Sequence, residues 1–272
     1  MVDEAGRGGD GTAAVETEGL ARRFGDFTAV DHIDLRVRGG SFFGFLGPNG
    51  AGKSTTIKML TGLLAPSAGS ALVLGRDIAR EPLEVKRRIG VVPEDLNLFE
   101  RLTGAEMLSF TGRMYGLGRD EIAARSRELL ELMELDAEPR RLVVEYSHGM
   151  KKKLALACAL IHRPEMLFLD EPFEGVDAVA SRTLKDLLSR LTARGLTVFL
   201  TSHVLEIVER LCTDIAIISG GRLVAAGPLE ELRRGISVGG GAAGGALSLE
   251  DYFISVVGGT RDASADALGW LG

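Results

Sequence analysis

The stretch Gly47-Pro48-Asn49-Gly50-Ala51-Gly52-Lys53-Ser54-Thr55 decides the fold. It matches the pattern G-x-x-x-x-G-K-[ST], which binds phosphate when a strand precedes it and a helix follows it. The apolar run 41–46 predicts that strand, and the pattern of residues 53–64 predicts a helix that ends near Pro66. Glycines let such a loop curl so that its N–H groups point at phosphate oxygens, and the helix N-terminus adds partial positive charge.

Two side chains of this loop indicate the ligand more closely. Lys53 supplies a cation for terminal phosphates, and the hydroxyl of Ser54 is suited to ligate Mg²⁺. A glycine-rich turn without a ligand is the alternative interpretation. The motif alone does not separate kinases, G proteins, ATPases and transport motors.

A pair of carboxylates follows the apolar run 166–169. Asp170 and Glu171 come at the C-terminal end of this predicted strand, where α/β sheets hold their ligands. Because strand side chains alternate, Asp170 is expected to reach the Mg²⁺ region and Glu171 to hold a water as general base. The alternative is that Asp170 caps the strand and Glu171 is solvated, but the nearby phosphate loop favours the catalytic interpretation.

Apolar runs alternate with helical periodicity along the chain. Further strands are expected at 88–92 and 197–200, with a hairpin at 214–218 and 222–225. Further helices are expected at 105–115, 121–133, 148–162 and 178–194. Fully apolar strands between helices indicate a parallel sheet covered on both faces. The predicted fold class is α/β: a P-loop NTPase core with a mixed, mainly parallel sheet, an N-terminal antiparallel β flank (14–37) and a helical insert subdomain (about 95–160).

Composition divides the chain into four parts. Residues 1–14 are acidic and rich in glycine, which predicts a flexible tail, and residues 15–236 form the folded domain. A Gly/Ala run at 237–246 predicts a linker. Residues 247–272 form a short C-terminal extension, in which 247–257 has the pattern of an amphipathic piece.

Charge and hydropathy exclude several classes of protein. The longest unbroken apolar run, 154–161, is far shorter than the roughly 20 residues of a membrane-spanning helix, so the chain is not expected to span a membrane by itself. Cys158 and Cys212 are too few for a disulfide framework. The net charge of −6 provides no broad electrostatic reason to bind nucleic acid.

The stretch Tyr146-Ser147-His148-Gly149-Met150 separates the possible families. Here the chain resembles the nucleotide-binding domain of ABC transporters, whose signature is Leu-Ser-Gly-Gly-Gln. Ser147 and Gly149 match that signature, whereas His148 and Met150 depart from it. Alone, Ser147 reads as a plain helix cap, but its spacing to Asp170-Glu171 favours a signature. In the family this serine and the helix N–H groups touch the γ-phosphate held by the partner's phosphate loop.

Four further positions fit the resemblance. Phe24 falls where the family stacks an aromatic ring on adenine, although a lone Phe is usually a core residue. Asp177 matches the loop that couples the two sites of the dimer, and it is equally suited to cap a helix. His203 resembles the switch histidine that contacts the γ-phosphate. Glu94 stands where the family usually has Gln near Mg²⁺ and water, so it keeps the oxygen ligand and loses the amide donors.

The resemblance covers about residues 15–232 and implies an ATPase. ATP is expected at Phe24 and residues 47–55, and Mg²⁺ at Ser54, Glu94 and Asp170. Lys53, Glu171 and His203 are the implied catalytic residues. The family implies a homodimer or a closely related heterodimer, packed head to tail, with the signature of one chain completing the site of the other.

The resemblance also implies a partner and a location in the cell. A separate transmembrane permease is the expected partner, at the cytoplasmic face of the cell membrane, and no nucleic acid is expected. Glu94, the diverged signature and residues 247–253 look similar to exporter-type subunits. The expected attachment surface is the apolar part of the insert near 94–117, some of which forms the insert's own core. The run Lys151-Lys152-Lys153 is expected on a solvated helix face, with a phosphate-facing Lys151 as the alternative.

Two other classes fit the sequence less well. A soluble ABC-type ATPase that acts on nucleic acid or ribosomes is expected to carry a long coiled coil before the signature or a second such domain. Only about 90 residues separate Lys53 from Ser147, and they have no sustained heptads. A G protein needs Asn-Lys-x-Asp, which neither Asn49 nor Asn97 opens.

Overall fold

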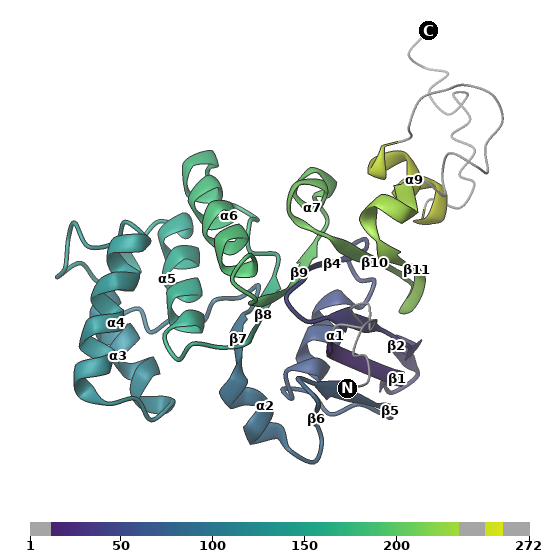
Figure 1. Cartoon of the computed structure of the whole chain (residues 1–272), viewed down its shortest axis with the longest axis horizontal. Coiled ribbons are helices and arrows are strands. Elements are labelled where there is room, and N and C mark those ends of the chain that lie inside the picture. The colour runs from purple at the N-terminus through teal and green to yellow at the C-terminus, as the bar shows by residue number, and fades with distance from the viewer. Residues whose placement is uncertain (1–11, 234–247, 258–272) are drawn as a thin grey trace, which may run out of the picture.

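The larger sheet of the computed structural model, which describes residues 12–233 and 248–257, has six strands (Figure 1). Their order across the sheet is β11 (Arg222–Pro228), β10 (Asp214–Ser219), β4 (Phe42–Leu46), β9 (Thr197–Ser202), β8 (Met166–Asp170) and β7 (Ile89–Val92). All neighbours in this sheet pair in parallel except β10 and β11, which are antiparallel. Every residue of β4, β8 and β9 is buried, as their unbroken apolar sequences predict.

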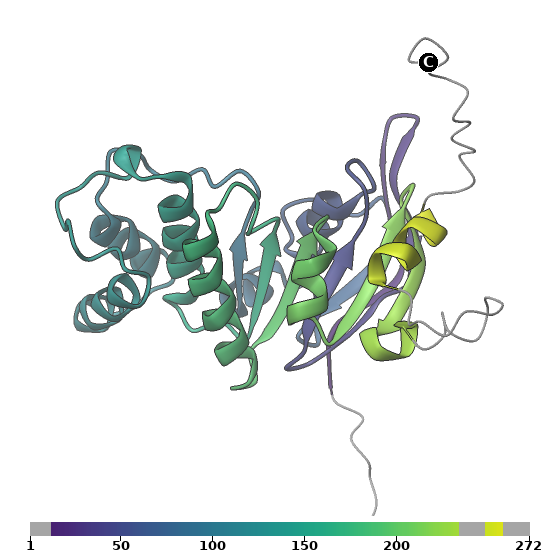
Figure 2. The ribbon, with the colours of Figure 1, turned by 90° about the horizontal axis from the view of Figure 1, so that it is seen from above.

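Helices and a second sheet cover the two faces of this sheet (Figure 2). On one face, α1 (Lys53–Leu60) and the second sheet pack around Phe45, Phe168 and Phe199. On the other face, the helices are α5 (His148–Leu160), α6 (Ala178–Thr192) and α7 (Leu205–Leu211). The predicted α/β class with a mainly parallel, covered sheet is therefore confirmed.

The second sheet is antiparallel and forms the predicted flank. Its strands are β1 (Ala13–Phe24), β2 (Phe27–Ile33), β3 (Arg36–Arg38), β5 (Ala68–Val73) and β6 (Arg76–Asp77). The prediction for 14–37 covers β1 to β3 and omits β5 and β6. Ala13 and Ala14, assigned to the tail by composition, belong instead to β1, where Ala13 pairs with Arg38 of β3. Both side chains are buried.

The helical insert contains α3 (Gly104–Met114), α4 (Arg119–Leu132), the short 3₁₀ helix η1 (Val143–Glu145) and α5. One prediction here is wrong: α5 has no solvated lysine face, because it lies between the insert and the sheet. Lys152 and Lys153 are buried, and Lys151 forms an ion pair with Glu100. A second difference is α2 (Pro82–Arg88), which ends on Arg88, where the sequence predicts a strand; β7 begins one residue later.

The described part of the C-terminal extension, residues 248–257, packs against the domain. Residues Leu249–Val257 form helix α9, as the amphipathic pattern predicts. Leu249 is fully buried, and its N–H donates to Oε1 of Glu209 on α7 at 3.1 Å. The predicted linker at 237–246 lies outside the described residues, as do 1–11 and 258–272. Within the described ranges, no helix is both long enough and apolar enough to span a bilayer.

Candidate active site

Four strands of the larger sheet end beside one another and deliver the predicted residues to one cleft. The loop 47–52 follows β4, Glu94 follows β7, Glu171 follows β8 and His203 follows β9. The cleft has a volume of about 360 Å³. Nine of the predicted residues line it: Asn49, Gly50, Gly52, Lys53, Ser54, Thr55, Glu94, Glu171 and His203. The carboxyl edge of the sheet is thus the candidate site, as in other α/β folds.

A larger cavity, of about 1240 Å³, opens at the opposite edge of the sheet. Gly40, Pro164 and Thr197, near the starts of β4, β8 and β9, line it, and none of the predicted site residues does. The smaller cleft is nevertheless the candidate site, because it contains the phosphate loop together with Glu171 and His203.

The loop after β4 requires glycine at two positions. A Cβ atom on Gly47 would lie 2.4 Å from the carbonyl oxygen of Ile218 in β10. A Cβ atom on Gly52 would lie 2.5 Å from the carbonyl oxygen of Ala29 in β2, and Gly52 has a φ of 109°. No other residue fits these contacts, so the loop backbone is held tightly against both sheets.

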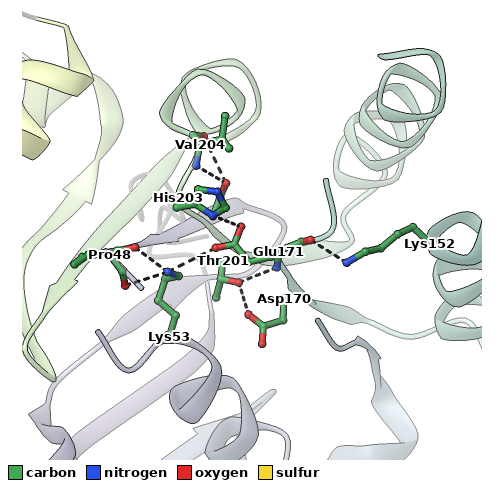
Figure 3. Close-up of polar contacts among 10 residues, drawn as sticks. Pro48, Lys53, Lys152, Asp170, Glu171, Thr201, His203 and Val204 are labelled. Atoms are coloured by element: carbon green, nitrogen blue, oxygen red, sulfur yellow. Dashed lines mark hydrogen bonds and ion pairs between the residues drawn. The ribbon is translucent and has the colours of Figure 1, made fainter. Parts of the chain in front are cut away.

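Lys53 begins helix α1 and turns back into the loop (Figure 3). Its Nζ donates to the carbonyl oxygens of Gly47 at 2.7 Å and Pro48 at 3.3 Å, and it lies 3.6 Å from Oε1 of Glu171. The side chain is buried. A cation is therefore fixed beside the curled loop, where it can exchange carbonyl partners for phosphate oxygens.

The carboxylate of Glu171 lies between two cationic or polar groups. Oε2 is 3.1 Å from Nδ1 of His203, while Oε1 faces Lys53 and accepts no hydrogen bond from any described residue. Glu171 is 6% exposed and has a φ of 46°, a left-handed conformation that is uncommon for a residue other than glycine. A buried carboxylate oxygen that lacks a donor is suited to accept one from a water molecule.

Asp170 is connected to Glu171 through Thr201. Oγ1 of Thr201 donates to Oδ1 of Asp170 at 2.6 Å and accepts from the backbone N–H of Glu171 at 3.0 Å. Asp170 is buried and does not line the cleft itself. The chain Asp170–Thr201–Glu171 therefore fixes the backbone at the point where β8 ends.

The cleft is rich in carboxylates. Partial burial, followed by the charges of Asp170 and Glu174, raises the pKa of Glu94 above its usual value. Glu174, which belongs to none of the sequence motifs, lines the cleft with Glu94 and Glu171. Carboxylates and the hydroxyl of Ser54 are hard oxygen donors, the type that Mg²⁺ prefers, so the residues present fit this ion.

The predicted aromatic residue Phe24 lies outside the lining of the cleft. It ends β1, is 46% exposed, and has the guanidinium carbon of Arg22 at 4.6 Å from its ring centroid. Phe27 pairs with it across the β1–β2 hairpin and does line the cleft. The place of Phe27 in the cleft results from this hairpin register, which no apolar pattern in the sequence marks.

The signature residues lie away from the cleft, at the start of helix α5. Oγ of Ser147 caps the helix by accepting from the N–H of Met150 at 3.2 Å. Nε2 of His148 donates to the carbonyl oxygen of Glu174 at 3.2 Å. Within one chain, therefore, Ser147 to Met150 do not join the phosphate loop, and only His148 reaches a residue that lines the cleft.

Asp177 lies beside the signature. It caps α6 by accepting from the N–H groups of Val179 at 3.0 Å and Ala180 at 2.9 Å. These hydrogen bonds, that of Ala180 above all, lower the pKa of Asp177. A Cβ atom on Gly149 would lie 3.2 Å from Oδ2 of Asp177, so the two segments pack closely. The helix-cap interpretation holds for both Ser147 and Asp177, and it leaves a second role open.

The fold and the phosphate loop define a P-loop nucleoside triphosphatase, and comparison with known proteins identifies which kind. The sequence profile of the ABC transporter family matches residues 30–174. Daunorubicin resistance ATP-binding protein DrrA3 of Streptomyces coeruleorubidus is 41% identical over 81% of this chain and 70% of its own length. Linearmycin resistance ATP-binding protein LnrL of Bacillus subtilis is 38% identical over 80% of this chain and 70% of its own.

Solved structures agree with these relatives. A structure described as the ATP-binding subunit of an ABC transporter superposes with a TM-score of 0.81 at 30% identity, over 89% of this chain and 99% of its own. The dimeric structure of the ATP-binding cassette MJ0796 bound to ADP and Pi superposes with a TM-score of 0.73 at 23% identity. The match covers 79% of this chain and 98% of that one and shows the same fold. The chain belongs to the ABC transporter family, as an ATP-binding subunit with an ATPase domain.

Proposed function

We propose that this chain hydrolyses ATP as a dimer and thereby drives export through a separate permease at the cytoplasmic face of a membrane. The observation that carries the proposal is the cleft in which Lys53 and His203 flank the buried carboxylate of Glu171. Relatives named for daunorubicin resistance, linearmycin resistance and Nod factor export support the direction of transport.

The phosphates of ATP bind the backbone of residues 47–55 and the ammonium of Lys53. Ser54 and Glu94, which line the cleft, and Asp170, whose charge acts on Glu94, are the residues that would hold Mg²⁺. The bound ion would supply positive charge to the phosphate oxygens. Adenine stacks at the end of the β1–β2 hairpin. Phe24 has the family position for this contact, and Phe27 is the aromatic residue that lines the cleft.

Hydrolysis follows from the surroundings of Glu171. Oε1, which lacks a donor, accepts a hydrogen bond from the attacking water and takes its proton. His203 holds Oε2 and fixes the rotamer, so that the water is oriented before the reaction. Lys53 stabilises the charge on the transferred phosphoryl oxygens.

The signature acts in a second copy of the chain. Ser147 and the N-terminus of α5 lie away from their own cleft and are free to meet the γ-phosphate held by a partner, with Asp177 beside them. Two sites form in this way between two chains, a homodimer or a closely related heterodimer. Loss of the γ-phosphate removes these contacts, and the dimer loosens.

A substitution at the signature tests this arrangement. In Ser147→Arg, a long cationic side chain fills the dimer face, so we expect hydrolysis to fall to background while each chain still binds ATP. ATP affinity by equilibrium dialysis and phosphate release, measured on the same preparation, separate the two effects. Ser147→Gly, which keeps a tolerated helix cap, controls for the lost cap. Loss of ATP binding in Ser147→Arg, with an unchanged melting curve, would show that Ser147 acts within its own chain.

The insert offers an exposed apolar surface, made by Phe99, Phe110 and Met114, for the permease. These side chains are 53%, 42% and 72% exposed, and the two rings pack edge to face at 5.0 Å. Such a surface suits the apolar face of a short helix. The predicted attachment region near 94–117 contains all three residues.

Met114→Glu tests this surface. We expect the charge to abolish copurification with the membrane fraction, while the isolated chain keeps its ATP affinity and melting temperature. Leu83→Glu is a matched control, because Leu83 is 69% exposed on α2, outside the insert. Equal loss of membrane association in both variants, or in neither, would argue against this docking surface.

A further inference from the structure

Lys152 is a buried lysine that joins the signature helix to the candidate base. It lies in the first turns of α5, the helix capped by Ser147, and it is 3% exposed. Its Nζ donates to the backbone carbonyl oxygen of Glu171 at 3.0 Å (Figure 3). This hydrogen bond connects α5 directly with the residue that follows strand β8.

The peptide that receives this hydrogen bond needs support. Glu171 has a φ of 46°, a conformation that costs free energy for a residue with a side chain and persists only where its surroundings hold it. On its N–H side, Thr201 of β9 accepts from it. On its carbonyl side, Lys152 donates to it. Glu171 is thus fixed at both ends, once from the sheet and once from the signature helix.

Burying the ammonium group of Lys152 costs free energy. Burial lowers the pKa of Lys152, while the charges of Glu174, Glu94, Asp170 and Glu171 oppose that shift. Among the described residues, no carboxylate oxygen lies within ion-pair distance of Nζ; the bond it makes is to a carbonyl oxygen. An apolar side chain of the same length would pack in the same place without this cost, so core packing does not explain a lysine here.

We propose that Lys152 is a positioning residue for Glu171. Through its hydrogen bond, Lys152 transmits the position of the signature helix to the carboxylate of Glu171. This inference rests on the proposed role of Glu171 as the base. When Ser147 engages the partner's nucleotide, a displacement of α5 moves Nζ of Lys152 and with it the backbone of Glu171. Hydrolysis thereby depends on closure of the dimer as well as on occupancy of the cleft.

Lys152→Met removes the ammonium and keeps an unbranched side chain. A displaced base loses reactivity steeply, so we expect kcat to fall roughly 10- to 100-fold. KM for ATP should change by less than about twofold, because the phosphate-binding contacts are intact. Lys152→Arg, which keeps a donor, should restore most of kcat. If Lys152 were merely structural, any loss of kcat in Lys152→Met would follow the loss of stability, and arginine would not restore kcat.

Lys153→Met is the matched control. Lys153 is the next residue of α5 and is also buried, but its Nζ pairs with Oε2 of Glu134 in the insert at 2.7 Å. Its loss should affect stability as much as that of Lys152 and leave kcat unchanged. Equal losses of kcat in the two variants would assign the effect to helix packing and overturn the proposal.

A double-mutant cycle with Glu171→Gln shows whether Lys152 acts through Glu171. If it does, Lys152→Met lowers kcat in the native background and adds no further loss to Glu171→Gln. An unchanged kcat in Lys152→Met, or losses that multiply, overturns the inference while the base survives. A native rate in Glu171→Gln alone removes the base, and this inference with it.

Discussion

Glu171→Gln should bind ATP as the native chain does and hydrolyse it roughly a hundredfold to ten-thousandfold more slowly, the range that general bases contribute. The amide keeps the shape of the side chain and still reaches Nδ1 of His203, which lies 3.1 Å from Oε2 of Glu171 in the native chain. It cannot take a proton from water. Single-turnover phosphate release, measured together with ATP affinity, separates the chemical step from binding.

The same substitution should trap a dimer. If the γ-phosphate joins the two chains, a variant that retains it stays closed, and size-exclusion chromatography in ATP and Mg²⁺ should show a stable species of doubled mass. Glu128→Gln, the same exchange at an exposed position on α4, is the control and should remain native in rate and mass. Native turnover in Glu171→Gln would exclude Glu171 as the base.

Local patterns in the sequence were sufficient to predict the phosphate loop and the ends of the strands. The loop follows directly on β4, and its glycines are required by the close approach of Ile218 and Ala29. Glu171 could be placed near this loop because it follows a buried strand, at the carboxyl edge where α/β sheets hold their ligands. Glu94 and His203 were assigned from the family resemblance, and in the structure each follows a strand that ends at the same edge.

Residues whose positions depend on packing between distant segments could not be predicted in this way. Lys152 looked like part of a solvated face, since three lysines in a row have no helical periodicity that marks one as buried. Its burial results from the docking of α5 between the insert and the sheet. Phe27 and Glu174 reach the cleft through a hairpin register and a loop, neither of which an apolar pattern encodes.

The signature helix α5 and the segment after β8 are linked by contacts that the sequence motifs do not reveal. His148 contacts the carbonyl oxygen of Glu174, and Lys152 contacts that of Glu171, so the start of α5 touches the segment after β8 twice. In the proposed dimer, the N-terminus of this helix meets the partner's phosphate, and Lys152 of the same helix holds Glu171, the proposed base. Within one chain, these two hydrogen bonds therefore connect the signature helix with the segment that lines the cleft.

Lys53→Ala should weaken ATP binding roughly tenfold to a hundredfold, because hydrogen bonds to a charged group contribute about 1.5 to 3 kcal/mol. In the present structure the ammonium donates to the carbonyl oxygens of Gly47 and Pro48 and lies near Glu171. Alanine removes all three contacts and leaves the acidic cleft without this cation, so phosphate groups meet carboxylates without compensation. The dissociation constant of ATP, measured by calorimetry with and without Mg²⁺, reports the loss.

Lys58→Ala is the matched control, because Lys58 belongs to the same helix α1 and is exposed. It should leave the dissociation constant unchanged, which removes net charge as an explanation. Lys53→Arg adds a further distinction: it keeps the charge, but its planar fork is larger than the space between Gly47, Pro48 and Glu171 that receives one ammonium. We therefore expect it to weaken binding as well. Native affinity in Lys53→Ala would contradict the assignment of residues 47–55 as the phosphate site.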